Sequence, residues 1–518
     1  MDGAYVIRIT YMPNLARANS VDALIRRAAA RTPHAVALHF SDRSHTYAEL
    51  DAAISRAAGR LLELGLEPGD RVAAYGTNSD AYAIAFFAAS RAGLIHVPVN
   101  FALQGEELSY ILADSGATAL LVDAALRPHF DSVASDTSIQ HVLDFREGPD
   151  SLLAQATTGD IPELTPPAGG DELVQLMYTS GTTSKPKGTM ISHSGQIHHY
   201  LACLQALDYS ADDRPLVCMP LYHTAAMHAF LVPYLAIGAE VFLHERPDIP
   251  VLLEAIERDS IGSMFLAPTV WVPLSNHPDL DSRDISSLKK AQYGASIMPT
   301  PVLQRLRAKY PELGFYNAFG QTEIGPVATV LRPEEHDERP ASAGRPVLFV
   351  ETRVIDAEGN DVAPGEQGEI VYRSPQLCLG YWNKPEATED AFEGGWFHSG
   401  DLVVRDEQGY VTVVDRIKDV INTGGVLVAS REVEEAIYGH DAVAEVAVVG
   451  MPHERWIEQV TAFVVVKDGA DEPNEDEIID FAAKHLASFK VPKQVIFVPQ
   501  LPRNQSGKLL KRVLRDEH

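Results

Sequence analysis

The sequence predicts an α/β fold: a large N-terminal domain of helix-covered sheets, a small barrel-like subdomain, and a small α+β domain at the C-terminus. Three observations predict it. Apolar strand-like runs alternate with Ala- and Leu-rich helical stretches, which is the pattern of parallel sheets covered by helices. Short Val/Ile/Tyr-rich strands with glycine turns follow over residues 340–414. A compact α+β pattern of about 100 residues, a normal size for a separate domain, then closes the chain.

The N-terminal elements show the alternation in order. Helical spacing of apolar residues runs from Glu49 to Leu64, and Gly65 is placed to end that helix. A Pro-Gly-Asp turn at 68–70 follows. We therefore expect Arg71–Tyr75 to be a short strand and Ser79–Ala92 an apolar helix.

The most informative stretch is the loop Thr179–Gly188, between a predicted buried strand, Leu173–Tyr178, and a helix from about Ser192. Small hydroxyl residues, two glycines and two lysines make this loop rich in donors, which suits it to a polyphosphate. It is not the common phosphate-binding loop, because Lys187 precedes Gly188 instead of following a glycine. For such a cluster taken alone, a solvated turn is the alternative interpretation.

The C-terminal half continues with shorter elements. In the barrel-like stretch, turns are predicted at 358–360 and 407–409. The α+β domain is predicted to contain the helix Glu432–His440, the strands Val443–Gly450 and Val460–Lys467, and the helix Glu475–Leu486.

Composition excludes several classes of function. A chain of 518 residues implies several domains, because single cores stop growing near about 250–300 residues. The formal charge of -28 argues against a nucleic-acid partner, which needs a basic face. No apolar run approaches the ~20 residues of a membrane span, and the N-terminus lacks a signal pattern. The scattered cysteines Cys203, Cys218 and Cys378 indicate reduced thiols in a cytoplasmic protein.

Further motifs stand in order along residues 44–512. Besides Thr179–Gly188 they are Thr46–Leu50, Arg91–Asn100, Pro220–Thr224, Asn317–Glu323, Gly368–Ile370 with Gly380–Trp382, His398–Leu402, Asp415–Asp419 and Pro502–Lys508. Together they resemble the adenylate-forming superfamily of acyl-CoA synthetases, peptide-synthetase adenylation domains and luciferases, and fatty acyl-CoA synthetases most closely. One departure is Ser184, where the family usually has glycine.

The resemblance implies an architecture and a reaction. Residues 1–417 would form the adenylate-forming domain with the ATP and acyl sites, and residues 418–518 a mobile lid with a catalytic lysine. A carboxylic acid, foremost a medium- or long-chain fatty acid, would attack the α-phosphorus of ATP and expel pyrophosphate. The resulting acyl-AMP would then pass its acyl group to the thiol of CoA. Positioning and charge stabilisation are the protein's tasks in the first step.

The same resemblance assigns several motifs to different parts of the bound nucleotide. The β- and γ-phosphates are assigned to Thr179, Ser180, Gly181, Thr182, Thr183, Lys185, Lys187 and Gly188, and the rest of the nucleotide to Asn317, Phe319, Gly320, Thr322, Asp401 and Arg416. Phe319 should stack on adenine, and Thr322 should contact the α-phosphate. Asp401 should accept hydrogen bonds from the ribose hydroxyls. Glu323 and Thr183 should coordinate Mg²⁺, which prefers oxygen ligands. Taken alone, Asp401 would be a turn residue and Arg416 part of a surface ion pair.

The lid carries the remaining assignments. Lys418 occupies the family's hinge position, and Lys508, which in isolation would be an exposed terminal lysine, resembles the lysine that enters the active site during adenylation. Its ammonium would neutralise charge developing between the carboxylate and the α-phosphate. Gly424 and Gly425 resemble the paired glycines that shape the pantetheine tunnel after the lid rotates.

The acid is less determined than the chemistry. Amino-acid-activating relatives place an Asp where this chain has His223 and Thr224, so an amino-acid substrate is not expected. Candidate walls of the acyl pocket, each of which core packing would explain equally well, are Tyr222, His223, Met227, Tyr293, Gly294, Ala295, Ile324 and Val327. Small residues at Gly294 and Ala295 would leave a channel for an alkyl chain. An aryl acid such as a cinnamate or benzoate stays open.

The acceptor stays open as well. After the paired glycines the family often has Glu-Asn, whereas this chain has Val426 and Leu427. CoA is the first expectation, and the phosphopantetheine of an acyl carrier protein, which would use the same tunnel, is the alternative. The short stretch 324–344 leaves little room for the insertion of many carrier-loading ligases, which favours CoA. A luciferase-like oxygenase would be revealed by light emission. A non-catalytic adenylate binder would be expected to lack Glu323, Asp401 or Lys508, and all three are present.

Overall fold

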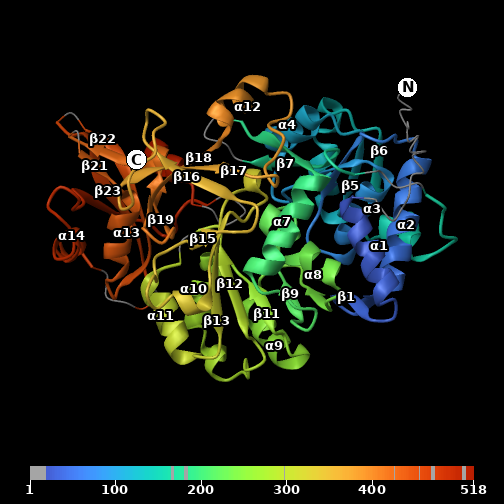
Figure 1. Cartoon of the computed structure of the whole chain (residues 1–518), viewed down its shortest axis with the longest axis horizontal. Coiled ribbons are helices and arrows are strands. Elements are labelled where there is room, and N and C mark those ends of the chain that lie inside the picture. The colour runs from blue at the N-terminus through green and yellow to red at the C-terminus, as the bar shows by residue number, and fades with distance from the viewer. Residues whose placement is uncertain are drawn as a thin grey trace, which may run out of the picture.

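The computed structural model describes residues 19–164, 169–179, 185–296, 298–424, 426–453, 455–467, 469, 473–503 and 509–517. In this part of the chain, helices and strands build the predicted α/β fold, with the strands in four sheets (Figure 1). The C-terminal elements lie at the left of the view, and the first helices and strands lie at the right (Figure 1).

The first sheet has the order β6-β5-β3-β4-β7-β8 and is parallel except for β8, which runs antiparallel to β7. Its strands are β3 (Arg71–Tyr75), β4 (Ile95–Val99), β5 (Ala119–Val122), β6 (His141–Asp144), β7 (Leu173–Thr179) and β8 (Lys187–Ser192). The α-helices of the same stretch are α1 (Val21–Arg31), α2 (Tyr47–Glu63), α3 (Asp80–Ala92), α4 (Gly105–Ser115), α5 (Arg127–Asp131) and α6 (Leu152–Thr157). Strands β3, β4 and β5 are almost wholly apolar, as expected for parallel strands covered on both faces.

The second sheet has the order β15-β14-β13-β12-β11-β9-β10-β1-β2. Its strands are β1 (Val36–Phe40), β2 (Arg43–Thr46), β9 (Pro215–Val217), β10 (Val241–Leu243), β11 (Ser263–Phe265), β12 (Lys290–Gly294), β13 (Gly314–Phe319), β14 (Thr329–Leu331) and β15 (Arg345–Pro346). The helices of this stretch are α7 (His193–Ala206), the π-helix η4 (Ala225–Leu231), α8 (Val232–Ile237), α9 (Ile249–Asp259), α10 (Pro268–Asn276), α11 (Thr300–Lys309) and the 3₁₀ turn η6 (Thr322–Ile324).

Two smaller sheets follow: the first is antiparallel, and the second, of order β21-β20-β23-β22, is antiparallel except for β24, which pairs with β23 in parallel. The stretch predicted to be barrel-like forms β16 (Glu351–Ile355), β17 (Gln367–Arg373), β18 (Phe397–Arg405) and β19 (Val411–Arg416), with helix α12 (Pro385–Ala391) between β17 and β18. The 3₁₀ turn η9 (Ile417–Asp419) leads into the last part of the chain. There the elements are β20 (Ile421–Thr423), β21 (Val426–Val428), α13 (Ser430–Tyr438), β22 (Val443–His453), β23 (Ile457–Val466), α14 (Glu475–Ala483), β24 (Gln494–Phe497) and α15 (Lys511–Glu517).

Local signals in the sequence account for many of these bounds. Thr46 and Glu49 form a capping box that starts α2, and Gly65, just beyond its end, has φ +85°. Ser79 caps the N-terminus of α3, and Gly93 ends it in the left-handed conformation. The predicted helices and strands at these places are therefore confirmed to within a few residues.

No helix in the described part of the chain combines the length and apolar character that a membrane crossing requires. All three cysteines are buried thiols.

Candidate active site

The end of β13 and the turn η6 form the centre of the candidate site, and the Pro220–Thr224 motif packs against them. The hydroxyl of Thr224 donates to the hydroxyl of Thr322 over 3.0 Å and lies 3.7 Å from the sulfur of Met177 on β7. Strands β7 and β13 belong to different sheets, so this contact joins the two large sheets at the position predicted for the α-phosphate.

Glu323, the predicted Mg²⁺ ligand, is 8% exposed and is held by the segment that follows β17. Tyr381 donates from its hydroxyl to Glu323 Oε1 over 3.1 Å, and the amide of Cys378 donates to the Glu323 carbonyl over 2.8 Å. The ammonium of Lys187 lies 4.8 Å from the centre of the Tyr381 ring. Tyr381 therefore contacts both the phosphate-loop lysine and the carboxylate.

Asp401 and Arg416, the predicted ribose residues, face each other on β18 and β19. Arg416 Nη1 donates to Asp401 Oδ1 and to the Ser399 carbonyl, each over 2.8 Å. Gln321 contacts the same Ser399 carbonyl over 3.3 Å, which brings this pair beside the Asn317–Glu323 motif. Because Asp401 is only 6% exposed, the pair is not a plain surface ion pair.

Part of the phosphate loop can be placed. Thr179 ends β7 and pairs in register with Lys187, the first residue of β8. The ammonium of Lys185 lies 5.0 Å from the centre of the Tyr110 ring, whose hydroxyl donates to the Pro186 carbonyl. The predicted residues Ser180, Gly181, Thr182, Thr183, Gly425 and Lys508 lie outside the described residues.

The adenine motif is built on close backbone packing. A Cβ atom added to Gly320 would lie 2.2 Å from the carbonyl oxygen of Pro326, so no side chain fits there. Asn317 donates from its side-chain amide to the Ser342 carbonyl over 3.0 Å. Phe319 is half-buried at the end of β13.

Four of the predicted acyl-pocket residues pack in one buried apolar cluster; they are Tyr222, Met227, Ile324 and Val327. His223 is half-buried, and its ring centre lies 4.3 Å from that of Tyr222. These five residues come from η4, η6 and the segments beside them, and Tyr222, His223 and Met227 are joined by direct contacts, with the Met227 amide donating to the His223 carbonyl over 3.2 Å.

The strand-end residues of β12 behave differently from the expectation. Tyr293 packs in a separate cluster with Trp271 and Phe315, and its hydroxyl forms a hydrogen bond with His336 Nε2 over 3.0 Å. Successive side chains of a strand point to opposite faces, so Tyr293 lies on the opposite face of β12 from Gly294 and outside the cluster that holds the other pocket candidates. A Cβ added to Gly294 would lie 2.2 Å from the Ala318 carbonyl oxygen, so the close approach of β13 requires this glycine. Ala295 is exposed, with φ +63°.

The predicted hinge and tunnel residues lie next to one another in the chain. Lys418 is exposed within η9. Gly424 has φ +65°, and its amide donates to the Trp456 carbonyl over 2.5 Å. The positive φ of Gly424 favours glycine, and a Cβ there would lie 3.2 Å from the Trp456 ring, a tight contact.

The Glu323 carboxylate, an oxygen ligand beside the phosphate loop, fits Mg²⁺. Among the described residues, no group of three or more His, Cys, Asp or Glu side chains could hold a metal ion alone. Mg²⁺ needs no such cage, because it binds through one or two carboxylates, substrate phosphates and water. One buried carboxylate beside a phosphate loop meets that requirement.

Reasoning from the sequence missed the role of the segment 376–382. Gln376 donates to the carbonyls of Ile324 and Val327, and Tyr381 and Cys378 hold Glu323. The Gly380–Trp382 motif was the available signal, but a motif alone does not say which distant side chain its tyrosine contacts.

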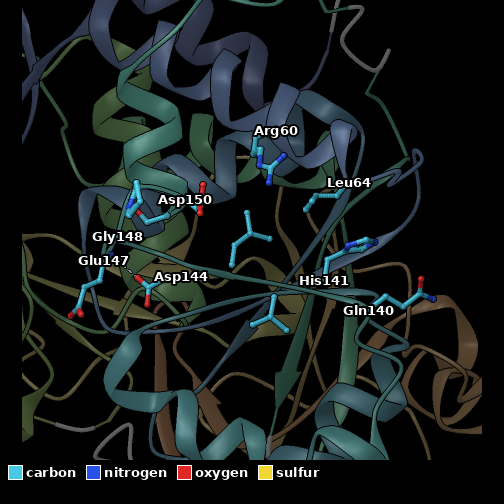
Figure 2. A pocket seen from close by; sticks show the side chains of 12 residues that line it. Arg60, Leu64, Gln140, His141, Asp144, Glu147, Gly148 and Asp150 are labelled. Atoms are coloured by element: carbon cyan, nitrogen blue, oxygen red, sulfur yellow. Dashed lines mark hydrogen bonds between the residues drawn. The ribbon is translucent and has the colours of Figure 1, made fainter.

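A separate hollow of about 630 Å³ lies at the outer edge of the first sheet (Figure 2). Arg60 of α2 and Leu64, just beyond its end, face His141 and Asp144 of β6 across it (Figure 2). None of the described residues predicted for the active site lines this hollow, so it is not part of the site.

Comparison with known proteins agrees with this geometry. The sequence matches the family of AMP-binding enzymes over residues 25–382 and the C-terminal domain of AMP-binding enzymes over residues 432–508. The chain therefore belongs to the AMP-binding, adenylate-forming enzyme family. The chemistry that goes with this membership is ATP-dependent ligation of a carboxylic acid to CoA.

Three relatives illustrate the range of acids. A feruloyl-CoA synthase of Amycolatopsis sp is 38% identical over 489 residues, covering 94% of this chain and 97% of the relative. The long-chain-fatty-acid–CoA ligase FadD13 of Mycobacterium tuberculosis is 33% identical over 478 residues, covering 92% and 94%. The crystal structure of the anthranilate CoA ligase AuaEII with anthranoyl-AMP superposes with a TM-score of 0.89 at 26% identity, covering 96% and 97%.

Proposed function

We propose that this site activates a carboxylic acid with ATP, releases pyrophosphate, and transfers the acyl group of acyl-AMP to the thiol of CoA. One observation carries the proposal. Lys187, Glu323 and the Asp401–Arg416 pair come from separate motifs, yet they lie around one turn: Tyr381 contacts Lys187 and Glu323, and Gln321 joins that turn to Ser399 beside Arg416.

Each side chain has a task in the first step. Lys185 and Lys187 would bind the β- and γ-phosphates, and Asp401 would accept the ribose hydroxyls. Thr322, held by Thr224, would donate to the α-phosphate. Glu323 and Thr183 would hold Mg²⁺, which when bound draws charge from the phosphate oxygens.

The lid would serve both steps. We propose that residues 1–417 and 418–518 form two domains and that the second rotates about Lys418. In one orientation Lys508 would neutralise charge at the α-phosphate, and in the other Gly424 and Gly425 would admit the thiol. CoA is the proposed acceptor, and the phosphopantetheine of a carrier protein is the alternative. Three buried thiols support a cytoplasmic location.

For the acid, a medium- or long-chain fatty acid is the first candidate. Four of the residues predicted for the acyl pocket, Tyr222, Met227, Ile324 and Val327, are apolar and buried, and none of the eight predicted pocket residues carries a carboxylate that would bind an ammonium group. An apolar acyl group would therefore be favoured over an amino acid. The similarity to the fatty-acid ligase of Mycobacterium tuberculosis is consistent with this choice.

An aryl acid is the second candidate, and one feature of the structure favours it. The rings of Phe230 and Phe265 stack with centres 4.1 Å apart and planes 8° from parallel. The missing side chain of Gly294 faces Phe265, because an added Cβ would lie 3.7 Å from that ring. A flat aromatic wall suits a planar acid, and the relative with 38% identity is a feruloyl-CoA synthase.

A panel assay tests the function and ranks the acids. Pyrophosphate release is measured with fatty acids from acetate to stearate, benzoate, cinnamate, ferulate and several amino acids, with and without CoA, and the products are identified by mass spectrometry. CoA-stimulated turnover with an acyl-CoA product is expected. Acyl-AMP that accumulates despite CoA would point to a carrier protein, and no pyrophosphate release with any acid would overturn the proposal.

A further inference from the structure

We propose that Tyr381 is a positioning residue that holds Lys187 and Glu323 apart, so that the lysine stays available for the phosphates and the carboxylate for Mg²⁺. The inference rests on the proposed function, which assigns those two ligands. It adds a task for a residue that contacts neither the acid nor the thiol in that scheme.

The ring of Tyr381 contacts the two charges in different ways. Its hydroxyl donates to Glu323 Oε1 over 3.1 Å, and its face receives the Lys187 ammonium at 4.8 Å from the ring centre. An aromatic face attracts a cation, while the phenol hydroxyl is a hydrogen-bond donor for a carboxylate. One side chain therefore satisfies both charges without letting them form an ion pair.

The main chain of residues 378–382 places this ring between two elements. Leu379 and Trp382 donate from their amides to the carbonyls of Met190 and Gly188 over 2.9 and 2.8 Å, and the Met190 amide donates back to Gly380. Strand β8 ends the first sheet, so this segment covers its free edge. The Cys378 amide meanwhile binds the Glu323 carbonyl, which fixes η6 to the same segment.

Burial makes the arrangement effective. Tyr381 is 9% exposed and Glu323 is 8% exposed, so water screens their contact weakly. A phenol hydroxyl keeps its proton at neutral pH, so Tyr381 remains a donor to Glu323 there. Without the ring, no Tyr381 side chain would stand between the Lys187 ammonium and the Glu323 carboxylate, and opposite charges in a poorly screened site attract each other. Such a pair would have to break before the metal and the phosphates could bind.

The test measures metal binding, so that it does not depend on turnover. The full chain is saturated with the non-cleavable analogue α,β-methylene-ATP, and Mn²⁺ is titrated by electron paramagnetic resonance. Tyr381→Phe keeps the ring under Lys187 and removes the donor to Glu323. We expect the Mn²⁺ dissociation constant to rise about tenfold, the equivalent of about 1.4 kcal/mol. A constant equal to that of the unmodified protein would overturn the inference.

A second pair of variants tests the separation of charges. Tyr381→Leu removes the hydroxyl and the ring, so Lys187 can pair with Glu323, and we expect weaker Mn²⁺ binding than in Tyr381→Phe. Adding Lys187→Met to Tyr381→Leu removes the competing ammonium. Mn²⁺ binding by the double variant should therefore return to the level of Tyr381→Phe. If Tyr381→Leu binds Mn²⁺ as well as Tyr381→Phe does, the ring does not separate the charges and that part of the inference fails.

The chain offers a matched control. Tyr410 donates from its hydroxyl to Glu335 Oε1 over 2.6 Å, and the Arg339 guanidinium lies 4.1 Å from its ring centre. Tyr410→Phe therefore removes the same kind of contact at another place, and its Mn²⁺ constant should not change. Glu323→Gln separates the two levels of the proposal. If it leaves Mn²⁺ binding intact, the metal assignment of the proposed function fails; if it weakens binding while Tyr381→Phe does not, only the inference about Tyr381 fails.

Discussion

Ser430 donates two hydrogen bonds to one oxygen of Asp415, from its amide over 2.7 Å and from its hydroxyl over 2.6 Å. Both residues are buried, and they lie on opposite sides of Lys418, the predicted hinge. Lys511, on the last helix, donates to the Ser430 hydroxyl and pairs with Glu434 over 2.8 Å. The hydrogen of the Ser430 hydroxyl must therefore point to Asp415, because an ammonium can only donate.

This contact predicts how the lid is restrained. Rotation about Lys418 would separate Asp415 from Ser430, so Ser430→Ala, which removes one bond to a charged acceptor, should ease rotation. A hydrogen bond to a charged group contributes about 1.5–3 kcal/mol, so we expect limited proteolysis between residues 417 and 424 to accelerate about tenfold or more. Ser275→Ala, at a half-buried serine of α10, is the control. Equal cleavage rates in Ser430→Ala and the unmodified chain would contradict this.

Lys508→Ala should separate the two half-reactions. If its ammonium stabilises charge only during adenylation, acyl-AMP formation falls by about 10²–10³, the usual effect of losing one transition-state donor. Thioester formation from supplied acyl-AMP should remain close to normal. Each half-reaction is followed by rapid quench, and an equal loss in both would refute the assignment.

Asp401→Asn should weaken ATP binding with little effect on folding. The amide keeps the shape of the carboxylate but loses the charge that pairs with Arg416 over 2.8 Å and would accept the ribose hydroxyls. We expect the dissociation constant of ATP, measured by calorimetry, to rise about tenfold or more. Asp361→Asn, which alters a mostly exposed pair with Arg353, serves as the control and should leave ATP binding unchanged. Similar ATP constants for both variants would argue against a ribose contact.

Acid should destabilise the fold through His96, which lies wholly buried on β4. Burial lowers its pKa from 6.5 to about 3, so the unfolded chain takes up a proton that the folded chain does not. Protonation of His96 therefore does not affect the free energy of unfolding above pH 6.5. As the pH drops below 6.5 towards 3, that free energy falls by up to about 1.4 kcal/mol per pH unit.

The measurement is urea unfolding at a series of pH values from 7.5 to about 4.5, in the range where the protein refolds. His96→Phe removes the titrating group and keeps an aromatic ring beside Tyr82 and Phe86. Its stability should decline less steeply with falling pH than that of the unmodified chain. Parallel curves would show that His96 does not control this acid response.

Prediction from sequence worked best where the signal is local. The helix at Ser79–Ala92 was predicted from its apolar run, and α3 spans Asp80–Ala92 with Ser79 as its N-cap and Gly93 just beyond its end. It worked less well at Tyr293. A strand end and an aromatic residue suggested a pocket wall, but which face of β12 meets α10 and which meets the pocket depends on the order of the strands.

Gly294 is a second position where the sequence of one strand did not indicate which residue of the neighbouring strand it contacts. A small residue at this strand end suggested an open acyl channel, and the structure adds a separate reason for glycine, since a Cβ would collide with the carbonyl of Ala318 on β13. The alternation of residues along β12 could not reveal that neighbour, because β13 follows only after helix α11.

The sequence by itself determined the class of fold, the order of the motifs and the family, because capping residues, glycines and hydrophobic spacing act over a few residues and the motifs keep their residue types. The tertiary structure alone decided which side chains meet. Tyr381 stands between Lys187 and Glu323, and Asp415 meets Ser430, because sheet order and the pairing of segments bring together residues that are distant in the chain. Such contacts depend on how whole elements pack, and no local pattern encodes that packing.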